Sequence, residues 1–483
     1  MKWTLPTRTD SEAALRFDPP RRTTRCDIFC RNCDSLCASR LGRPRRTAAL
    51  WATALLAWAS PVLAAEAPWT LERCLGYALT NSPDAVIAQK RIRAAEAGIQ
   101  QANAMAWPTL QFQSSYTRTD NPMYVLGSAL NQQAFGPALS DFNDLPDVDD
   151  LNVKGQVTVP LYAGGAITAG RRAAKAGAQA AKANAEAIRN TLAFETVRAF
   201  HTIQKARAFV RAAEAGVNAF EQHLALAQKR FDAGTLLRSE VLDVEVRLAQ
   251  AREDLARTRN ALALAQRALR TLLGIDSGEF DVADTAPEVA APDSADFSGR
   301  AELTAVRHMT AAAEEQTRMA RSGYLPRLAA FGSLDYDKGW KLDGDGESYT
   351  AGVLLQWNIF DGRLTRGKVA EARANVDAAL EQERKLKLGL GFEVEQAQLN
   401  LREANERLAV TAKAITQAEE SVTLTRDRFE QGLAITLQLI DSETALTAAR
   451  VRRAEAEADQ RIAVAALRKA LGFEQLSAVA TSH

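Results

Sequence analysis

A long stretch without proline most limits what this chain can fold into. It runs from Ala166 to Lys229 and consists almost entirely of good helix formers. From Ala199 to Phe231 its apolar residues recur in steps of four and three, the heptad pattern of left-handed coiled-coil packing. Small residues alternate with large ones along this seam, which lets helix backbones approach closely. The seam comprises Ala199, Ile203, Ala206, Val210, Ala213, Val217, Phe220, Leu224, Ala227 and Phe231.

The stretch ends in a turn and the heptad pattern then begins again. Gly234, after Arg230-Phe231, suits the left-handed conformation that follows a helix end. A second apolar seam runs from Val241 to Leu272. These features predict one continuous helical hairpin.

The same hairpin occurs twice. Adding 198 to a residue number reaches the second copy without a gap over more than a hundred residues, so that Arg230-Phe231 becomes Arg428-Phe429 and Gly234 becomes Gly432. The seam of small and large residues recurs from Ala397 to Phe429. A period near 200 residues is too long for a solenoid and indicates two halves of one architecture.

Each half also contains two stretches in which the period changes from helical to two. Apolar and polar residues alternate over 110–117, 153–161, 328–336 and 349–359, each of about ten residues. A tilted strand of this length crosses a membrane with its apolar face toward lipid and its polar face toward water. The stretch from Asp120 to Asp150 is rich in Asn, Asp, Pro and Gly, and the stretch from Lys338 to Glu347 is rich in Gly and Asp. Both are expected to be loops.

Four such strands predict an oligomer. They cannot close a barrel by themselves, and an open sheet in lipid leaves backbone groups unpaired. Two copies would give eight strands, whose interior side chains fill, whereas three would give twelve strands and an open lumen. Each long helix, of about 65 residues, would be roughly 95–100 Å long. The predicted fold is therefore mainly α, with duplicated coiled-coil hairpins and four β-strands per chain. Three chains would form a 12-strand β-barrel continuous with a periplasmic α-helical barrel.

The N-terminal region predicts export. Basic residues at 43–46 precede an apolar run from Ala48 to Ala59, and small residues end at Ala64, so we expect a signal peptide over 41–64 that is cleaved after Ala64. Residues 1–40 are a doubtful extension and a possible mis-called start. Because their cysteines are irregularly spaced and precede the signal, we expect no metal site there. These cysteines are Cys26, Cys30, Cys33 and Cys37.

The remaining chain is expected to follow a simple plan. Residues 65–275 form the first repeat and 298–475 the second. Residues 276–297 form a linker or equatorial segment between them, and 476–483 a C-terminal tail. The mature chain has no apolar stretch long enough for a transmembrane helix.

The order of these elements resembles the TolC-like outer-membrane efflux and export factor family. The resemblance is carried by Arg230-Phe231-x-x-Gly234-Thr235 with Val241-Leu242-Asp243, and by Arg428-Phe429-x-x-Gly432 with Leu439-Ile440-Asp441. Pro160-Leu161-Tyr162-x-Gly164 and Ile359-Phe360-Asp361-Gly362 mark the base of the predicted barrel. It covers essentially the whole mature chain. The resemblance implies a homotrimer in outer-membrane lipid that docks a periplasmic adaptor protein and an inner-membrane pump of the RND, ABC or MFS type.

The resemblance also implies that the two hairpin turns contact the adaptor. Alternatively, the two glycines only end their helices, and both roles are compatible. The implied contact residues are Gly234, Thr235, Leu236, Leu237, Arg238 and Ser239 at the first turn and Gly432, Leu433, Ala434, Ile435 and Thr436 at the second.

Just beyond the second turn, the family often carries two acidic residues that ring a closed periplasmic entrance. Here those positions are Gln438 and Asp441, so one carboxylate is missing. Three Asp441 carboxylates near an axis would attract cations and oppose closure. Alternatively, Asp441 is a solvated residue or pairs with Arg428. Asp243 and Glu240 on the first hairpin are weaker candidates for holding the entrance shut.

Enzymatic functions find little support. His201, His223 and His308 lie far apart without an acidic partner at metal or triad spacing, and no phosphate loop follows a strand. We expect no enzyme activity, cofactor or metal site. A formal net charge of +1 gives no reason to expect nucleic acid as a partner. An alternative function is a periplasmic coiled-coil scaffold or adaptor without a channel. Efflux and type I secretion are not separated by the sequence.

Overall fold

The computed structural model describes residues 68–139, 141, 144–278 and 280–476. The chain divides into two units, residues 1–65 and 66–483. The expected N-terminal extension and signal peptide, with their four cysteines, lie outside the described residues, as does nearly all of the expected C-terminal tail. Among the described residues, no helix combines the length and apolarity that a membrane crossing requires.

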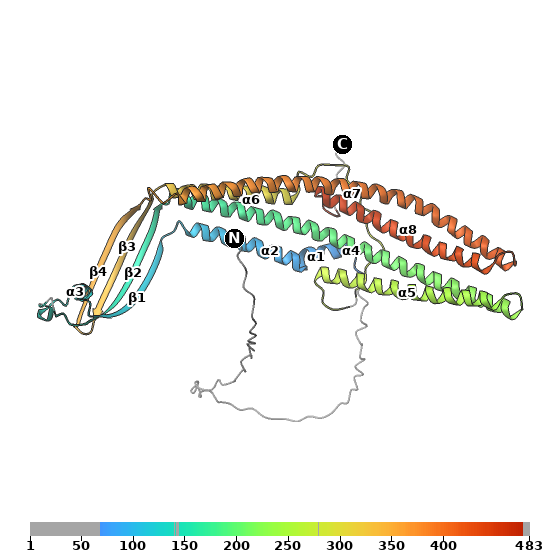
Figure 1. Cartoon of the computed structure of the whole chain (residues 1–483), viewed down its shortest axis with the longest axis horizontal. Coiled ribbons are helices and arrows are strands. Elements are labelled where there is room, and N and C mark those ends of the chain that lie inside the picture. Colours follow the sequence, from blue (N-terminus) through green and yellow to red (C-terminus); the bar gives the residue numbers. More distant parts are fainter. Residues whose placement is uncertain (1–67, 140, 142–143, 279, 477–483) are drawn as a thin grey trace, which may run out of the picture. The chain divides into compact units, whose positions relative to one another are not determined.

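Two long helical hairpins dominate the described residues. The first consists of α4 (Ala166–Asp232) and α5 (Arg238–Leu273), and the second of α7 (Leu364–Glu430) and α8 (Thr436–Leu471). Both helices of the second hairpin begin 198 residues after their counterparts, which confirms the duplication. Figure 1 shows the four helices running side by side, with both hairpin turns at the end away from the sheet.

Shorter helices accompany the long ones. α1 (Leu71–Asn81) and α2 (Pro83–Ala104) pack on α4, and α6 (Ala301–Arg321) packs between α4 and α7 before the short turn η2 (Ser322–Tyr324). Each half thus combines one unbroken helix with a column of shorter helices.

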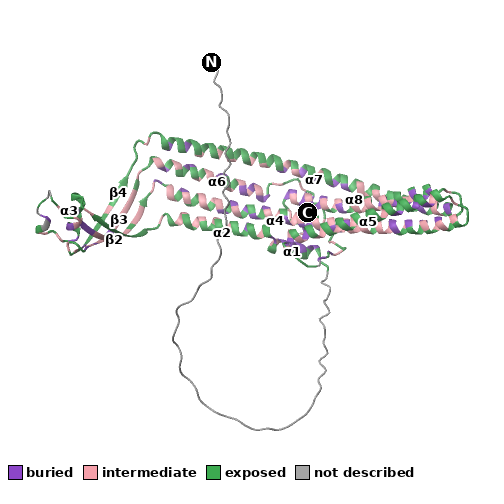
Figure 2. Cartoon of the chain, turned by 60° about the horizontal axis from the view of Figure 1, so that its bottom comes forward, coloured by how far each residue is buried: buried purple, intermediate pink, exposed green. Residues whose placement is uncertain are grey.

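The predicted seams form the helix interfaces. Every residue of the first seam is buried or half-buried. Ala397 and Phe429, the first and last residues of the repeated seam, are buried. Ile203 and Val241 have no exposed surface, and Phe429 is 2% exposed. Burying one large apolar side chain stabilises a fold by about 1.5–3 kcal/mol. Figure 2 shows the buried residues as recurrent bands along helices whose other faces are exposed.

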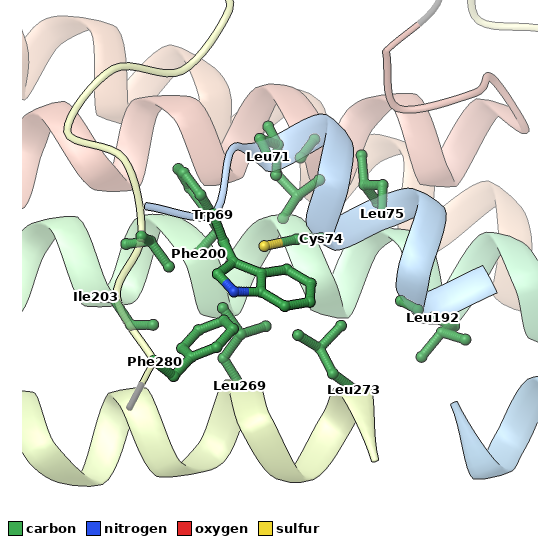
Figure 3. Packing of buried hydrophobic residues seen from close by; sticks show 14 residues of the cluster. Trp69, Leu71, Cys74, Leu75, Leu192, Phe200, Ile203, Leu269, Leu273 and Phe280 are labelled. Carbon is green, nitrogen blue, oxygen red and sulfur yellow. The ribbon is translucent and has the colours of Figure 1, made fainter. Parts of the chain in front are cut away.

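The segment expected to link the halves is fixed to the helices. Trp69 and Val282 form a parallel bridge, in which the Trp69 N–H donates to the Asp281 carbonyl at 2.8 Å. The Trp69 ring packs against Phe280, with the ring centroids 5.3 Å apart. Figure 3 shows this cluster between α1, α4 and α5, with Cys74 at its centre. Phe280 and Val282 of this segment therefore belong to the packed core between α1, α4 and α5.

The four strands form one antiparallel sheet in the order β1-β2-β3-β4. They are β1 (Thr109–Thr119), β2 (Val148–Tyr162), β3 (Arg327–Gly339) and β4 (Gly344–Gln356). The inner strands are paired on both sides. β1 and β4 each have one edge without a partner strand in the described chain.

The register divides the sheet into two chemically different faces. The row Gln111, Gln156, Ser333 and Thr350 crosses all four strands on one face, and Lys154 forms an ion pair with Asp335 on the same face. Phe331 is an exception, lying over Gly352. The opposite face carries exposed apolar side chains. They include Leu110, Phe112, Tyr116, Val157, Leu334, Tyr349, Val353 and Leu355.

The passage from strand to long helix uses left-handed backbone in both halves. Gly164 has φ +61°, and a Cβ atom there would lie 2.8 Å from the Ser322 carbonyl oxygen, so a glycine is needed. In the second half, Arg363 is left-handed with φ +72°, and the Asp361 carboxylate accepts the N–H of Thr365 at 2.8 Å. Both motifs expected at the barrel base therefore mark this passage.

The structure corrects both loop predictions. The stretch between β1 and β2 contains a helix, α3 (Pro122–Asn131), and a short turn, η1 (Pro137–Leu139). Between β3 and β4, only residues 340–343 lie outside the strands, and β4 ends at Gln356, before the expected limit. The Asn, Asp and Pro content of this stretch concealed the α3 helix, which buries Val125 and Ala129 against the end of the sheet. Tertiary packing outweighed local turn preference there.

Candidate functional site: the paired hairpin turns

The two hairpin turns have the same backbone geometry. Gly234 and Gly432 are left-handed, with φ +73° and +77°. At the first turn the Thr235 N–H donates to the Arg230 carbonyl at 2.9 Å, and at the second the Leu433 N–H donates to the Arg428 carbonyl at 2.8 Å. These bonds satisfy carbonyl groups that a helix end otherwise leaves free. The Arg-Phe-x-x-Gly motif is thus a helix-ending device in both copies.

Apolar side chains project from these turns. Leu237 is 70% exposed, Leu433 73% and Ile435 58%. Leu437, which the sequence analysis did not single out, is also exposed. Clusters of exposed apolar side chains mark interaction sites on protein surfaces that face water.

The other predicted contact residues divide by exposure. Leu236 and Ala434 are half-buried, and Thr436 is buried. The exposed members are Gly234, Thr235, Arg238, Ser239 and Gly432.

The two turns are joined to each other within one chain. The Arg230 guanidinium donates to the Glu430 carbonyl at 2.7 Å and lies 4.5 Å from the centre of the Phe429 ring. The Thr436 hydroxyl donates to the Glu240 carboxylate at 3.3 Å. Ile440 of α8 packs into the apolar cluster formed by α4 and α5. The turns therefore form one surface instead of two separate ends.

The entrance candidates occupy different environments. Gln438, Asp441 and Asp243 are exposed, and within the described chain Asp441 makes no ion pair with Arg428 or any other residue. Glu240 is half-buried, and its carboxylate accepts the Leu237 N–H at 3.2 Å in addition to the Thr436 hydroxyl. Glu240 therefore caps α5 and contacts the second hairpin.

Sequence reasoning missed a buried ionic cluster behind the second turn. Glu443 of α8 accepts from His223 of α4 at 3.0 Å and from Arg426 of α7 at 2.9 Å. The side chains of His223 and Glu443 are only 5% and 6% exposed. Sequence spacing gave no sign of this pair, because the acidic partner of His223 lies 220 residues further along the chain.

The environment of Glu443 favours its charged form. Burial acts to raise the pKa of its carboxyl group, but hydrogen bonds and positive charge from His223 and Arg426 outweigh burial and hold that pKa below the ordinary value of 4.5. A lowered pKa in the folded state means that this carboxylate stabilises the fold above about pH 4.5 and ceases to do so as the pH falls further.

Other reactive side chains are enclosed. Cys74 is fully buried, and burial raises the pKa of its thiol to about 12. Burial also lowers the pKa of His201 to about 4, against a hydrogen bond with Gln204. Within the described ranges, no group of three His, Cys, Asp or Glu side chains is arranged to hold a metal ion.

Comparison with known proteins identifies the family. The sequence matches the outer membrane efflux protein family over residues 75–275 and 297–473, which is most of the chain. The chain belongs to this family, and the predicted resemblance is confirmed. The match covers both hairpins and both pairs of strands.

Individual relatives have modest identity. The chain is 25% identical to the alkaline protease secretion protein AprF of Pseudomonas aeruginosa over 54% of its length, spanning 56% of that protein. It is 24% identical to the solvent efflux pump outer membrane protein SrpC of Pseudomonas putida, over 83% of this chain and 85% of that one.

Solved structures share the fold. The outer membrane protein VceC of Vibrio cholerae has a TM-score of 0.70 at 20% identity, covering 83% of this chain and 96% of that one. The CmeC outer membrane channel of Campylobacter jejuni has a TM-score of 0.73 at 16% identity, covering 84% and 87%. The duplicated fold with its small sheet is therefore the fold of known outer-membrane channels.

We predict that Glu443→Gln destabilises the protein at neutral pH by about 1–3 kcal/mol, because it removes the negative charge that His223 and Arg426 surround. The loss should shrink progressively below about pH 4.5, where first the carboxyl group of the unfolded chain and then, at lower pH, the native carboxylate becomes protonated. Thermal unfolding of detergent-extracted protein, followed by circular dichroism at pH 7 and below pH 4.5, measures both effects.

The matched control is Asp441→Asn, two residues away. Its carboxylate is exposed and unpaired among the described residues, so its removal should change stability by less than about 0.5 kcal/mol. Equal destabilisation by both variants would contradict a specific role for the Glu443 cluster.

Proposed function

We propose that this protein is the trimeric outer-membrane exit duct of a tripartite efflux or type I secretion system. The observation that carries the proposal is the four-stranded sheet, with one polar face, one exposed apolar face and two unpaired edges. Such a sheet is viable in lipid only if its edges pair with other copies. Three copies give twelve strands around a water-filled lumen.

A second unpartnered surface on the long helix supports assembly. α7 buries its predicted seam, yet another of its faces bears apolar side chains that are all about half or more exposed and spaced by 8, 4, 7, 11 and 14 residues. These intervals return to one face of a helix, so the stripe is suited to packing against another copy. Its members are Leu380, Leu388, Phe392, Leu399, Val410 and Leu424.

The partners follow from this role. In the proposed assembly the joined hairpin turns meet a periplasmic adaptor protein, which connects the duct to an inner-membrane pump, and the apolar strand face contacts outer-membrane lipid. Relatives are named for protease secretion, solvent efflux and cobalt-zinc-cadmium resistance, so pump and adaptor would select the substrate. In this role the chain carries out no catalytic step and needs no cofactor.

We predict that the protein, extracted from outer membranes in mild detergent, has the native mass of a trimer and appears in electron micrographs as a long cylinder with a short barrel. Native mass measurement and class averages on unboiled protein test this. Recovery of a monomer or dimer without detergent would overturn the duct and favour a periplasmic scaffold, in which the apolar strand face would have no lipid to contact.

For the turns, we predict that Leu433→Asp with Ile435→Asp abolishes pump-dependent export and leaves the trimer intact. Charges on both exposed side chains would prevent apolar contact with an adaptor. Export assays and adaptor cross-linking in cells measure the loss. Leu433→Met with Ile435→Val keeps the surface apolar and should retain export, whereas normal export by the charged variant would refute docking at this turn.

For the entrance, we propose that three Asp441 carboxylates surround the periplasmic opening. Asp441→Asn should then reduce the cation selectivity of single channels in planar bilayers, measured as a reversal-potential shift in a salt gradient. Asp243→Asn serves as the comparison on the first hairpin. An unchanged reversal potential for Asp441→Asn would remove Asp441 from the pore lining.

A further inference from the structure

The short helix α3 lies at the end of the sheet away from the long helices (Figure 1). The chain between β1 and β2 is longer than its counterpart between β3 and β4, and α3 occupies the extra length. α2 and α6 begin 218 residues apart, at Pro83 and Ala301, whereas α4 and α7 begin 198 apart. The first half thus carries a 20-residue insertion at this end of the sheet.

α3 and the turn after it lie on the polar face of the sheet. Gln132 is 1% exposed, and its amide donates to the Asp149 carbonyl and the Asp150 carboxylate, each at 2.8 Å. By register, Asp150 shares its face with Asn152 and Lys154. The insertion therefore folds over the side of the sheet that faces the lumen in the proposed duct.

Three glycines in the strand ends beside the β3–β4 turn permit this close approach. A Cβ atom on Gly339 would overlap the Gln132 amide, one on Gly344 would overlap Ala134, and one on Gly346 would overlap the Asn131 carbonyl. The backbone of 131–134 therefore lies directly against the sheet, and the position of α3 is fixed by packing.

α3 presents an apolar surface away from the sheet. None of its ten residues is charged, and Val125 and Ala129 are fully buried toward the sheet. The side chains that point away are exposed to an unusual degree for their size, a pattern that marks a contact surface. They are Met123 at 78%, Tyr124 at 66%, Leu130 at 62% and, just after the helix, Phe135 at 52%.

We propose that the α3 helices of three copies meet inside the outer mouth of the barrel and form an apolar constriction there. This inference rests on the proposed trimeric duct. The occupant of the apolar surface is a second copy of this chain, because the polar sheet face that carries α3 becomes the inner wall when the edges of β1 and β4 pair between copies.

The dimensions are compatible with contact. Twelve strands about 4.8 Å apart and tilted by about 40° enclose a backbone circle roughly 24 Å across. Three helices about 10 Å wide, packed around one axis, need roughly 21–22 Å. Helices held on the inner wall by their buried faces therefore reach one another with their apolar faces.

Cysteine cross-linking tests the arrangement in the full-length protein. Leu130→Cys should give a covalent dimer with a short bismaleimide in detergent-extracted trimers. Tyr349→Cys, 80% exposed on the opposite sheet face, is the matched control and should give none. The parent protein controls for native cysteines, of which Cys74 is buried.

Native mass separates the two ways of failing. An intact trimer without a Leu130→Cys cross-link would overturn the constriction and leave the duct standing. Absence of a trimer would overturn both. A Leu130→Cys cross-link in the trimer, absent from the Tyr349→Cys control, supports the constriction.

A second measurement tests whether the constriction slows the entry of a large reagent from outside the cell. Gln111→Cys places a thiol on the polar face of β1, nearer the helices than α3. A maleimide carrying a polymer too large for porins should label it severalfold faster when Met123, Tyr124 and Leu130 are all replaced by Ser. Equal labelling rates with and without these replacements would contradict a constriction by α3.

Discussion

The unpaired backbone edges of β1 and β4 are the constraint on which the rest of the architecture depends. Hydrogen-bonding groups along a strand edge cannot remain unpaired in lipid, and the exposed apolar face of this sheet cannot remain in water. Both demands are met when copies of the chain pair edge to edge. The polar row from Gln111 to Thr350 then lines an interior. In the proposed duct, the sheet thereby determines oligomerisation, the position of the membrane and the direction of the lumen.

The two hairpins are held together along the length of the long helices and at their turns. Heptad seams hold each pair of helices, and contacts between hairpins hold the two turns as one surface. Arg230 reaches the second hairpin through Phe429 and Glu430, while Glu443 joins α4, α7 and α8. A movement of one turn relative to the other must therefore break specific polar contacts.

Much of the fold could be predicted from the sequence, because the informative patterns are local and repeated. The seam from Ala199 to Phe231, the strand alternation and the offset of 198 residues are each visible without knowledge of distant contacts. α3 was missed because its surroundings, rich in Asn, Asp and Pro, resemble a loop. Only packing against the sheet makes a ten-residue helix stable. The role of Gly346 was likewise invisible, since its neighbour Asn131 lies more than two hundred residues earlier.

The sequence by itself determined the long helices, the strands, the duplication and the chemistry of the two sheet faces, because periodicity fixes which side chains share a face. Only the tertiary structure decided which distant groups meet. His223 hydrogen-bonds to Glu443, which lies 220 residues later in the chain, and Glu240 accepts a hydrogen bond from Thr436. The α3 region packs on the polar face of the sheet instead of the apolar one. Such pairings depend on how whole elements pack in three dimensions, and no local pattern in the chain encodes them.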